Sequence, residues 1–353
     1  ISLDLKGNPI LESKKPTLDR FDEMYPFTTL QASGPAVGLP WGQAGNSEVG
    51  HLTIGSGRIM HHHLPRIISS IYDGSFLKNE VFLKAAEHTR AHNSRLHIIG
   101  LTSSGSVHSY IDHLWALFDF AKNENIPHVF LHALTDGKDS PPQESASFLE
   151  TLAERCAQDW PFARISSVIG RLYAMDRDEH WDRIEKTYSL LIEGKGEITS
   201  SAPSYIKSLY EKEITDEFIL PAVVAATPEE GRQSRIREND AIIFFNFRED
   251  SMREILHAFT DEPFDRFPRK KPANLFIATM TEYQKGLPVE VAFPLLEIKE
   301  PLSAVLARAE FRQLHIAETE KYAHVTYFFN GGKETPFPGE ERILVPSIAT
   351  AHF

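Results

Sequence analysis

Short apolar segments alternate with amphipathic segments between residues 66 and 280, and this alternation restricts the fold more than any other feature. The apolar segments have the length of buried strands, and the first amphipathic segment carries Ile111, Leu114 and Phe118 on one helical stripe. The pattern predicts an α/β fold, with a mostly parallel sheet covered by helices on both faces. The predicted strands are Arg95–Leu101, His128–Leu134, Arg164–Ile169, Ala241–Phe247 and Leu275–Met280.

The flanking regions have weaker patterns. A short helix is expected from Thr17 to Tyr25, where Leu18, Phe21 and Met24 share one face. Hinges are expected near His61–Pro65 and Pro288–Pro301, where the composition changes. Further strands are expected at Leu30–Ser33, Gln313–Ala317, His324–Phe329 and Arg342–Val345.

The glycine-rich stretch 45–59, GNSEVGHLTIGSGRI, contains Ser47. Ser47 stands where a helix can begin, and unpaired N–H groups at a helix start favour an anion. A hydroxyl there can attack phosphorus if a partner takes its proton or binds its alkoxide. The alternative is that Ser47 only caps a helix.

Charged side chains follow the predicted strands. Ligands of open α/β sheets bind outside the carboxyl ends of the strands, so these residues should share one rim. Four cations and a histidine would meet there, and the set suits a ligand with phosphate and carboxylate groups. These residues are His108, Lys138, Arg171, Arg177 and Arg248.

Simpler interpretations of the same residues remain open. Loop charges are often only solvated. Asp136 and Asp139 are also typical of a turn or a helix cap. The triplet His61-His62-His63 invites a metal site, but adjacent side chains on a strand point to opposite faces. Lys321 lies outside the predicted sheet and, taken alone, is most simply a surface lysine.

Composition narrows the class of protein. The chain has 353 residues, which favours two domains, and its net charge of -12 argues against nucleic-acid and anionic-membrane partners. Cys156 is the single cysteine, which fits a reducing, cytoplasmic location. The longest apolar run, Phe218–Ala226, is too short to span a bilayer.

Six segments together resemble the cofactor-independent phosphoglycerate mutases, a family of the alkaline phosphatase superfamily. The resemblance implies a discontinuous phosphatase-like domain at 1–62 and 297–353, with an inserted phosphotransferase domain at 64–295. It also implies interconversion of 3-phosphoglycerate and 2-phosphoglycerate through a phosphoserine. The segments are GNSEVGHLTIGSGRI (45–59), VHSYIDHL (107–114), LTDGKDSPP (134–142), GRLYAMDRDEHWDR (170–183), IIFFNFRED (242–250) and AETEKYAHVTYFFNGG (317–332).

The resemblance also assigns roles to single residues. Ser47 matches the nucleophile and a metal ligand of the family, which uses two divalent metal ions, commonly Mn²⁺, and no 2,3-bisphosphoglycerate. A small-molecule substrate and a monomer are expected. The positions that match substrate-binding residues are His108, Lys138, Asp139, Arg171, Arg177, Arg248 and Lys321.

Two positions and both ends depart from the family pattern. Lys138 and Ser251 stand where arginine is usual, and Arg253 lies too far around a helix to replace the second one. The other metal ligands of the family fall outside Ile1–Phe353, so we expect a truncated and inactive fragment. The alternatives are a related phosphomutase or phosphatase acting on another small phosphorylated acid, and a non-catalytic remnant that binds substrate.

Overall fold

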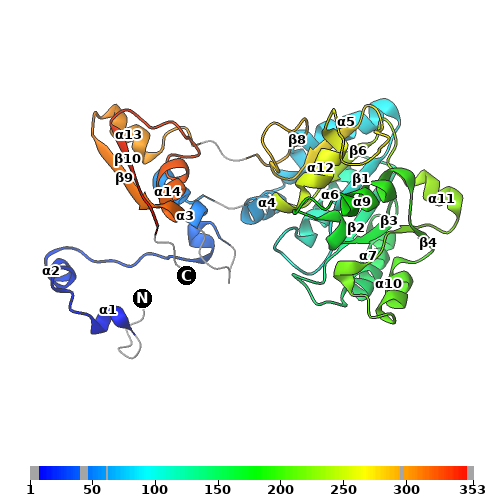
Figure 1. Cartoon of the computed structure of the whole chain (residues 1–353), viewed down its shortest axis with the longest axis horizontal. Coiled ribbons are helices and arrows are strands. Elements are labelled where there is room, and N and C mark those ends of the chain that lie inside the picture. The colour runs from blue at the N-terminus through cyan, green and yellow to red at the C-terminus, as the bar shows by residue number, and fades with distance from the viewer. Residues whose placement is uncertain (1–7, 40–46, 61–62, 295–297, 348–353) are drawn as a thin grey trace.

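The computed structural model describes residues 8–39, 47–60, 63–294 and 298–347 (Figure 1). Most of the chain forms a body around an eight-stranded sheet with the strand order β4-β5-β3-β2-β1-β6-β7-β8. All neighbouring strands are parallel except β3 and β5, which are antiparallel. The strands are β1 Leu96–Leu101, β2 Val129–Thr135, β3 Ala163–Gly170, β4 Glu197–Thr199, β5 Ala222–Val224, β6 Ala241–Phe244, β7 Phe276–Thr279 and β8 Glu290–Val291.

Helices cover both faces of this sheet, as the alternating pattern predicts. The inner strands are buried on both sides, and successive residues of β6 enter opposite cores: Ala241 and Ile243 one, Ile242 and Phe244 the other. Helices α4–α7 and α10 pack in the first core, and α9 and α12 in the second. The helices are α4 His63–Tyr72, α5 Glu80–His92, α6 Ile111–Asn123, α7 Ser145–Asp159, α8 Arg171–Ala174, α9 Trp181–Glu193, α10 Ala202–Tyr210, α11 Pro228–Gln233 and α12 Arg253–Thr260, with short 3₁₀ turns η2 Phe76–Lys78, η3 Asp216–Phe218 and η4 Asp250–Met252.

A second, smaller body combines residues from the two ends of the chain. Its core element is a parallel pair of strands, β9 and β10, against which α14 packs. Its elements are η1 Gly34–Val37, α3 Ser47–Ser56, α13 Leu302–Arg308, β9 Gln313–Glu318, α14 Thr319–Ala323, the π-helix η5 His324–Phe328 and β10 Glu340–Val345. The helices α1 Pro9–Glu12 and α2 Pro16–Met24 precede these elements in the chain.

Two of the expected strands are wrong. Leu30–Ser33 has no regular structure, and the predicted strand His324–Phe329 is the π-helix η5. The apolar run of η5 resembles a buried strand in sequence, but it packs beside α3 as a helix. The helix expected at Thr17–Tyr25 forms as α2, yet its apolar face stays exposed in the structure.

The possible metal site and the hinge expected at the histidine triplet fall largely outside the described residues. Of the three histidines only His63 is described, as the first residue of α4. Among the helices that the structure describes, none combines the length and the apolar character needed to cross a bilayer.

Candidate active site

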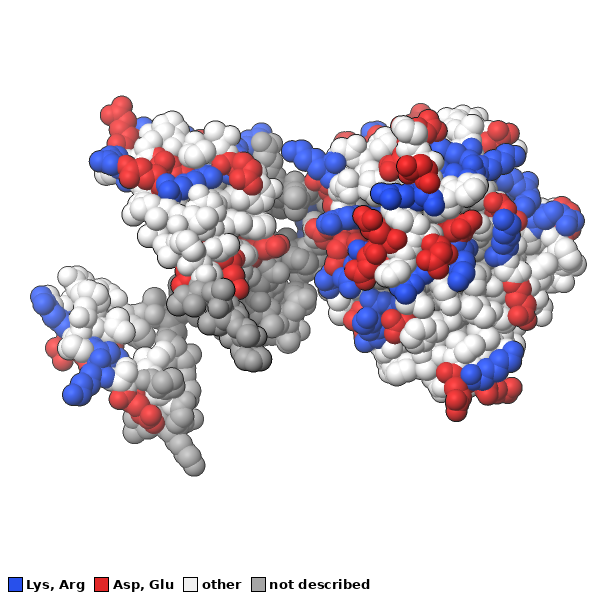
Figure 2. Space-filling view, viewed as in Figure 1, with Lys and Arg blue, Asp and Glu red and all other residues white. Residues whose placement is uncertain are grey.

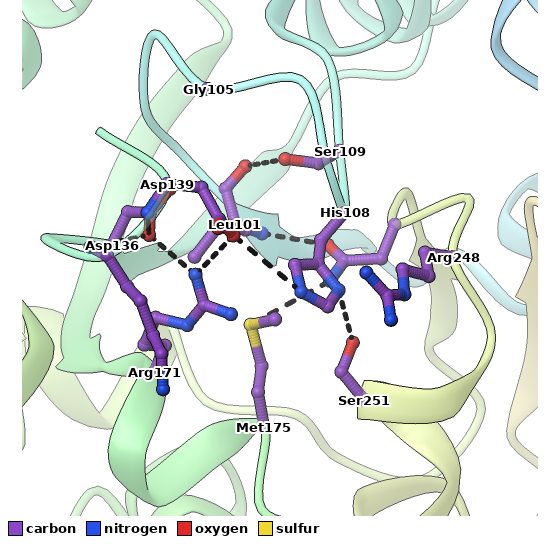
Figure 3. Close-up of polar contacts among 12 residues, drawn as sticks. Leu101, Gly105, His108, Ser109, Asp136, Asp139, Arg171, Met175, Arg248 and Ser251 are labelled. Atoms are coloured by element: carbon purple, nitrogen blue, oxygen red, sulfur yellow. Dashed lines mark hydrogen bonds and ion pairs between the residues drawn. The ribbon is translucent and has the colours of Figure 1, made fainter. Parts of the chain in front are cut away.

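The loops that follow β1, β2, β3 and β6 bring polar side chains together at one edge of the large sheet, which is formed by the carboxyl ends of these strands (Figure 3). Asp136 directly follows β2 and is fully buried. Its Oδ2 accepts a hydrogen bond from Ser103 Oγ at 2.8 Å, and its Oδ1 accepts one from the amide of Asp139 at 3.0 Å. Burial raises the pKa of Asp136, but these bonds and the Arg171 guanidinium outweigh it and keep the carboxyl ionised. Asp136 therefore organises the loop after β2.

Arg171 opens α8 at the end of β3 and is nearly buried. Its Nη1 donates to Asp136 Oδ1 and to Asp139 Oδ2, both at 2.6 Å. The preceding Gly170 packs so closely on the Glu217 carbonyl that a Cβ would lie 2.3 Å from its oxygen. Glycine is thus required for β3 to bring Arg171 to this edge.

His108 lies between Arg171 and Arg248 in the loop that follows β1 (Figure 3). Its Nδ1 lies 3.0 Å from Ser251 Oγ, and its Nε2 lies 3.7 Å from Asp139 Oδ2. Burial and the positive charges of Arg171 and Arg248 lower the pKa of His108 to about 4. The imidazole is therefore neutral near pH 7 and able to accept a proton.

Arg177 and Arg248 meet on one carboxylate. Asp250 Oδ2 accepts from Arg177 Nη1 at 2.8 Å and from Arg248 Nη2 at 2.9 Å. Both arginine side chains remain nearly half exposed, so part of each guanidinium faces solvent. The structure thus joins the loop after α8 to the loop after β6.

Lys138 departs from the expected arrangement at this edge, whereas Arg253 lies as expected. The Lys138 side chain is exposed, and its Nζ lies 3.9 Å from Glu217 rather than against the arginines. Arg253 Nε donates to the carbonyl of Tyr283 at 2.8 Å, which agrees with the expectation that it does not replace the arginine missing at Ser251.

Ser47 and Lys321 form a separate pair in the smaller body. Ser47 begins α3, and Lys321 Nζ donates to Ser47 Oγ at 2.7 Å. The close packing of α3 on the end of η5 brings them together: a Cβ on Gly55 would lie 2.0 Å from the Phe329 carbonyl oxygen. An ammonium group in this position stabilises negative charge on the serine oxygen. Among the described residues, no hydrogen bond or ion pair links Ser47 or Lys321 to the sheet-edge residues.

The described residues do not complete a metal centre at Ser47. In the part of the chain that the structure describes, the one group of histidine and carboxylate ligands close enough to share an ion is Asp176, Asp178 and His180, in the loop after α8. Asp176 already accepts hydrogen bonds from the amides of Asp178 and His180 and from Arg183 Nη1. We interpret this group as a capped turn that holds the loop of Arg177.

Sequence reasoning treated Asp136 as a turn residue and did not assign Asp250 a role. Both contact the predicted arginines directly. The sequence carries a signal for both, because each carboxylate follows a strand of the same sheet whose carboxyl ends also lead into the arginines it contacts.

The comparisons with known proteins all find the same kind of protein. A family model described as "BPG-independent PGAM N-terminus" matches residues 67–285. The chain is 46% identical over 350 residues to the 2,3-bisphosphoglycerate-independent phosphoglycerate mutase of Moorella thermoacetica, covering 99% of this chain and 67% of the relative. It is 46% identical over 354 residues to the mutase of the same name from Methanococcoides burtonii, covering 100% of this chain and 68% of the relative.

A solved structure is similar as well. The Leishmania mexicana phosphoglycerate mutase, determined at low cobalt concentration, superposes with a TM-score of 0.69 at 29% identity, covering 97% of this chain and 64% of that one. The chain therefore spans about two thirds of the length of the relatives that it matches.

Proposed function

Because this chain belongs to the family of 2,3-bisphosphoglycerate-independent phosphoglycerate mutases, which are isomerases, we propose that it interconverts 3-phosphoglycerate and 2-phosphoglycerate. The observation that carries the proposal is the 2.7 Å contact between Lys321 Nζ and Ser47 Oγ. A lysine beside a serine at a helix start supports a nucleophilic role for the hydroxyl. The names of the relatives do not favour the alternative of a phosphatase.

In the proposed reaction, Ser47 Oγ attacks the phosphorus of 3-phosphoglycerate. The bond from phosphorus to the 3-oxygen breaks, and the serine proton passes to that oxygen, which leaves phosphoserine and free glycerate. After the glycerate reorients, its 2-hydroxyl attacks the phosphoserine, the bond from phosphorus to the serine oxygen breaks, and the proton of the 2-hydroxyl passes to Ser47 Oγ. Lys321 offsets the negative charge on the serine oxygen in both steps.

The sheet-edge residues are proposed to hold the glycerate and its charged groups. Guanidinium groups bind phosphate and carboxylate oxygens through paired hydrogen bonds, a role we propose for Arg171, Arg177 and Arg248. The neutral imidazole of His108 is suited to accept a hydrogen bond from a glycerate hydroxyl. Asp139 and the exposed Lys138 complete the proposed set.

Other properties are proposed from the family alone. They are two divalent metal ions, Mn²⁺, with Ser47 as one ligand, independence from 2,3-bisphosphoglycerate, a monomeric state and a cytoplasmic location. Ser47 would hold one of these ions, which would bind the serine oxygen and the phosphoryl oxygens, and the steps above describe the side chains alone. We also propose the division into 1–62 with 297–353 and an inserted domain at 64–295.

The test compares Ser47→Ala with wild type in the product of the whole gene that encodes this sequence, assayed with 3-phosphoglycerate and Mn²⁺. We expect the substitution to lower kcat about 1,000-fold or more, because it removes the proposed carrier of the phosphoryl group. Ser56→Ala, at the other end of α3, is the matched control and should keep activity.

Mass spectrometry of the quenched wild-type reaction should find phosphate on the peptide that contains Ser47. Activity that survives Ser47→Ala would overturn the proposal. The expectation that the 353-residue chain is itself inactive remains a prediction, and turnover by that chain would contradict it.

A further inference from the structure

Asp250 occupies an unusual position between the cationic groups of the site. One of its oxygens, Oδ2, accepts from both Arg177 and Arg248. The other, Oδ1, is buried, lies 3.9 Å from His108 Nδ1 and has no hydrogen-bond partner among the described residues. A buried carboxylate oxygen without a partner costs free energy, so stability alone does not explain this arrangement.

The arginines that contact Asp250 are more exposed to solvent than the arginine that contacts Asp136. Arg171 is almost buried against Asp136 and Asp139, whereas Arg177 and Arg248 are nearly half exposed. Ion pairs with exposed partners contribute little net free energy, so they exchange readily for another anion. Acidic and basic side chains also lie next to one another over the visible face of the sheet body (Figure 2).

Building on the proposed function, we propose that Asp250 is a specificity-determining residue, an internal anion that competes with a ligand for Arg177 and Arg248. A single phosphate gains these guanidinium contacts only where Asp250 gives them up, so the exchange brings little net affinity. Phosphoglycerate carries a second anionic group, which can contact Arg171 and hold the ligand while Asp250 keeps its pairing with Arg177 and Arg248. Asp250 thereby favours a ligand with two anionic groups over free phosphate.

The experiment measures binding of inorganic phosphate and of 3-phosphoglycerate to the 353-residue chain by calorimetry. Asp250→Asn keeps the shape of the side chain and removes its charge. We expect the phosphate Kd to fall about three- to tenfold, while the 3-phosphoglycerate Kd changes less, so that the preference between them narrows. Glu249→Gln removes the same charge one residue away, where the described residues show no bond to either arginine, and should change both Kd values less than about twofold.

Asp250→Ser provides a second neutral variant, and thermal unfolding of each variant checks its fold. If both variants bind phosphate as wild type does and keep its preference for 3-phosphoglycerate, the role of Asp250 is overturned. The proposed function is not affected by that outcome. An equal loss of affinity for both ligands would also overturn the role of Asp250, since a residue that only holds the loop in place would give that result. A wild-type chain without preference for 3-phosphoglycerate would instead contradict the proposed function, and with it the preference assigned to Asp250.

Discussion

At the scale of single residues, the candidate site consists of charges that are already paired before any ligand binds. Arg171 is held by Asp136 and Asp139, and Arg177 with Arg248 by Asp250. Such pairing fixes the guanidinium groups in place, which lowers the entropy that a ligand must remove when it binds. The Ser47 hydroxyl has a cation as its partner instead.

The Ser47–Lys321 contact predicts that Lys321→Met in the product of the whole gene lowers kcat about 100-fold or more, because an electrostatic donor at the reacting oxygen is lost. Lys321→Arg, which keeps the charge, should recover part of the rate. The measurement is steady-state turnover of 3-phosphoglycerate, with Lys333→Met in the following loop as the control. A change confined to KM would show that Lys321 only binds substrate.

At the scale of elements, a buried row of hydrogen-bonded polar groups runs across the large sheet, from the residue before β6 through β1 and β2 to β3. His97 of β1 lies 2.9 Å from His132 of β2 through Nδ1, and 3.1 Å from Asp240 through Nε2. His132 Nδ1 in turn lies 2.7 Å from Ser167 Oγ of β3. All three hydrogen bonds form when Ser167 donates to His132, His132 donates to His97, and His97 donates to the Asp240 carboxylate. Burial lowers the pKa of both histidines, so both are neutral in the folded protein.

Buried neutral histidines make the sheet body sensitive to acid. Burial lowers the pKa of His113 on α6 to about 3, against an ordinary value of 6.5. Between these values the unfolded chain binds more protons, so stability is fully present above pH 6.5 and is lost as the pH falls toward 3. At pH 4 we expect His113 alone to cost roughly 3 kcal/mol.

This prediction is checked by denaturant unfolding at pH 7.5 and pH 4. The loss of unfolding free energy between the two pH values should be smaller in His113→Leu than in wild type. The exposed His128→Asn is the control and should match wild type. An equal loss in all three proteins would contradict the assignment to His113.

At the scale of the whole molecule, the two bodies differ in how well their strands are covered. Every residue of β1 and β2 is buried, whereas β9 and β10 expose apolar side chains, among them Leu314, Ile316 and Leu344. A two-stranded sheet without a buried face is marginal in water. The large body therefore holds most of the stability of the described chain.

Hydrogen exchange of the 353-residue chain tests this difference. Amides of β1, β2 and β6 should exchange only through global unfolding, whereas those of β9 and β10 should exchange at least about 100-fold faster through local opening. Mass spectrometry of peptides from the two sheets measures both rates. Equal protection in the two sheets would contradict this account.

Local sequence determined the elements and the order in which they occur. The five long apolar segments are confirmed as β1, β2, β3, β6 and β7, since each carries its own strand pattern and turn signals. The failed strand at His324–Phe329 shows the limit, because a short apolar run fits a buried helix equally well. The short strands β4, β5 and β8 were missed, since two or three residues carry no periodicity.

The sequence by itself determined which residue types reach the edge of the sheet, because a charged residue after a parallel strand can lie only at that strand's carboxyl end. Only the tertiary structure decided how those charges pair. Asp250 bridges two arginines that lie 73 and 2 residues away in the chain, and Ser47 meets Lys321 across 274 residues. Distances of this kind depend on how helices and loops pack, and a pattern of residue types along one segment does not contain them.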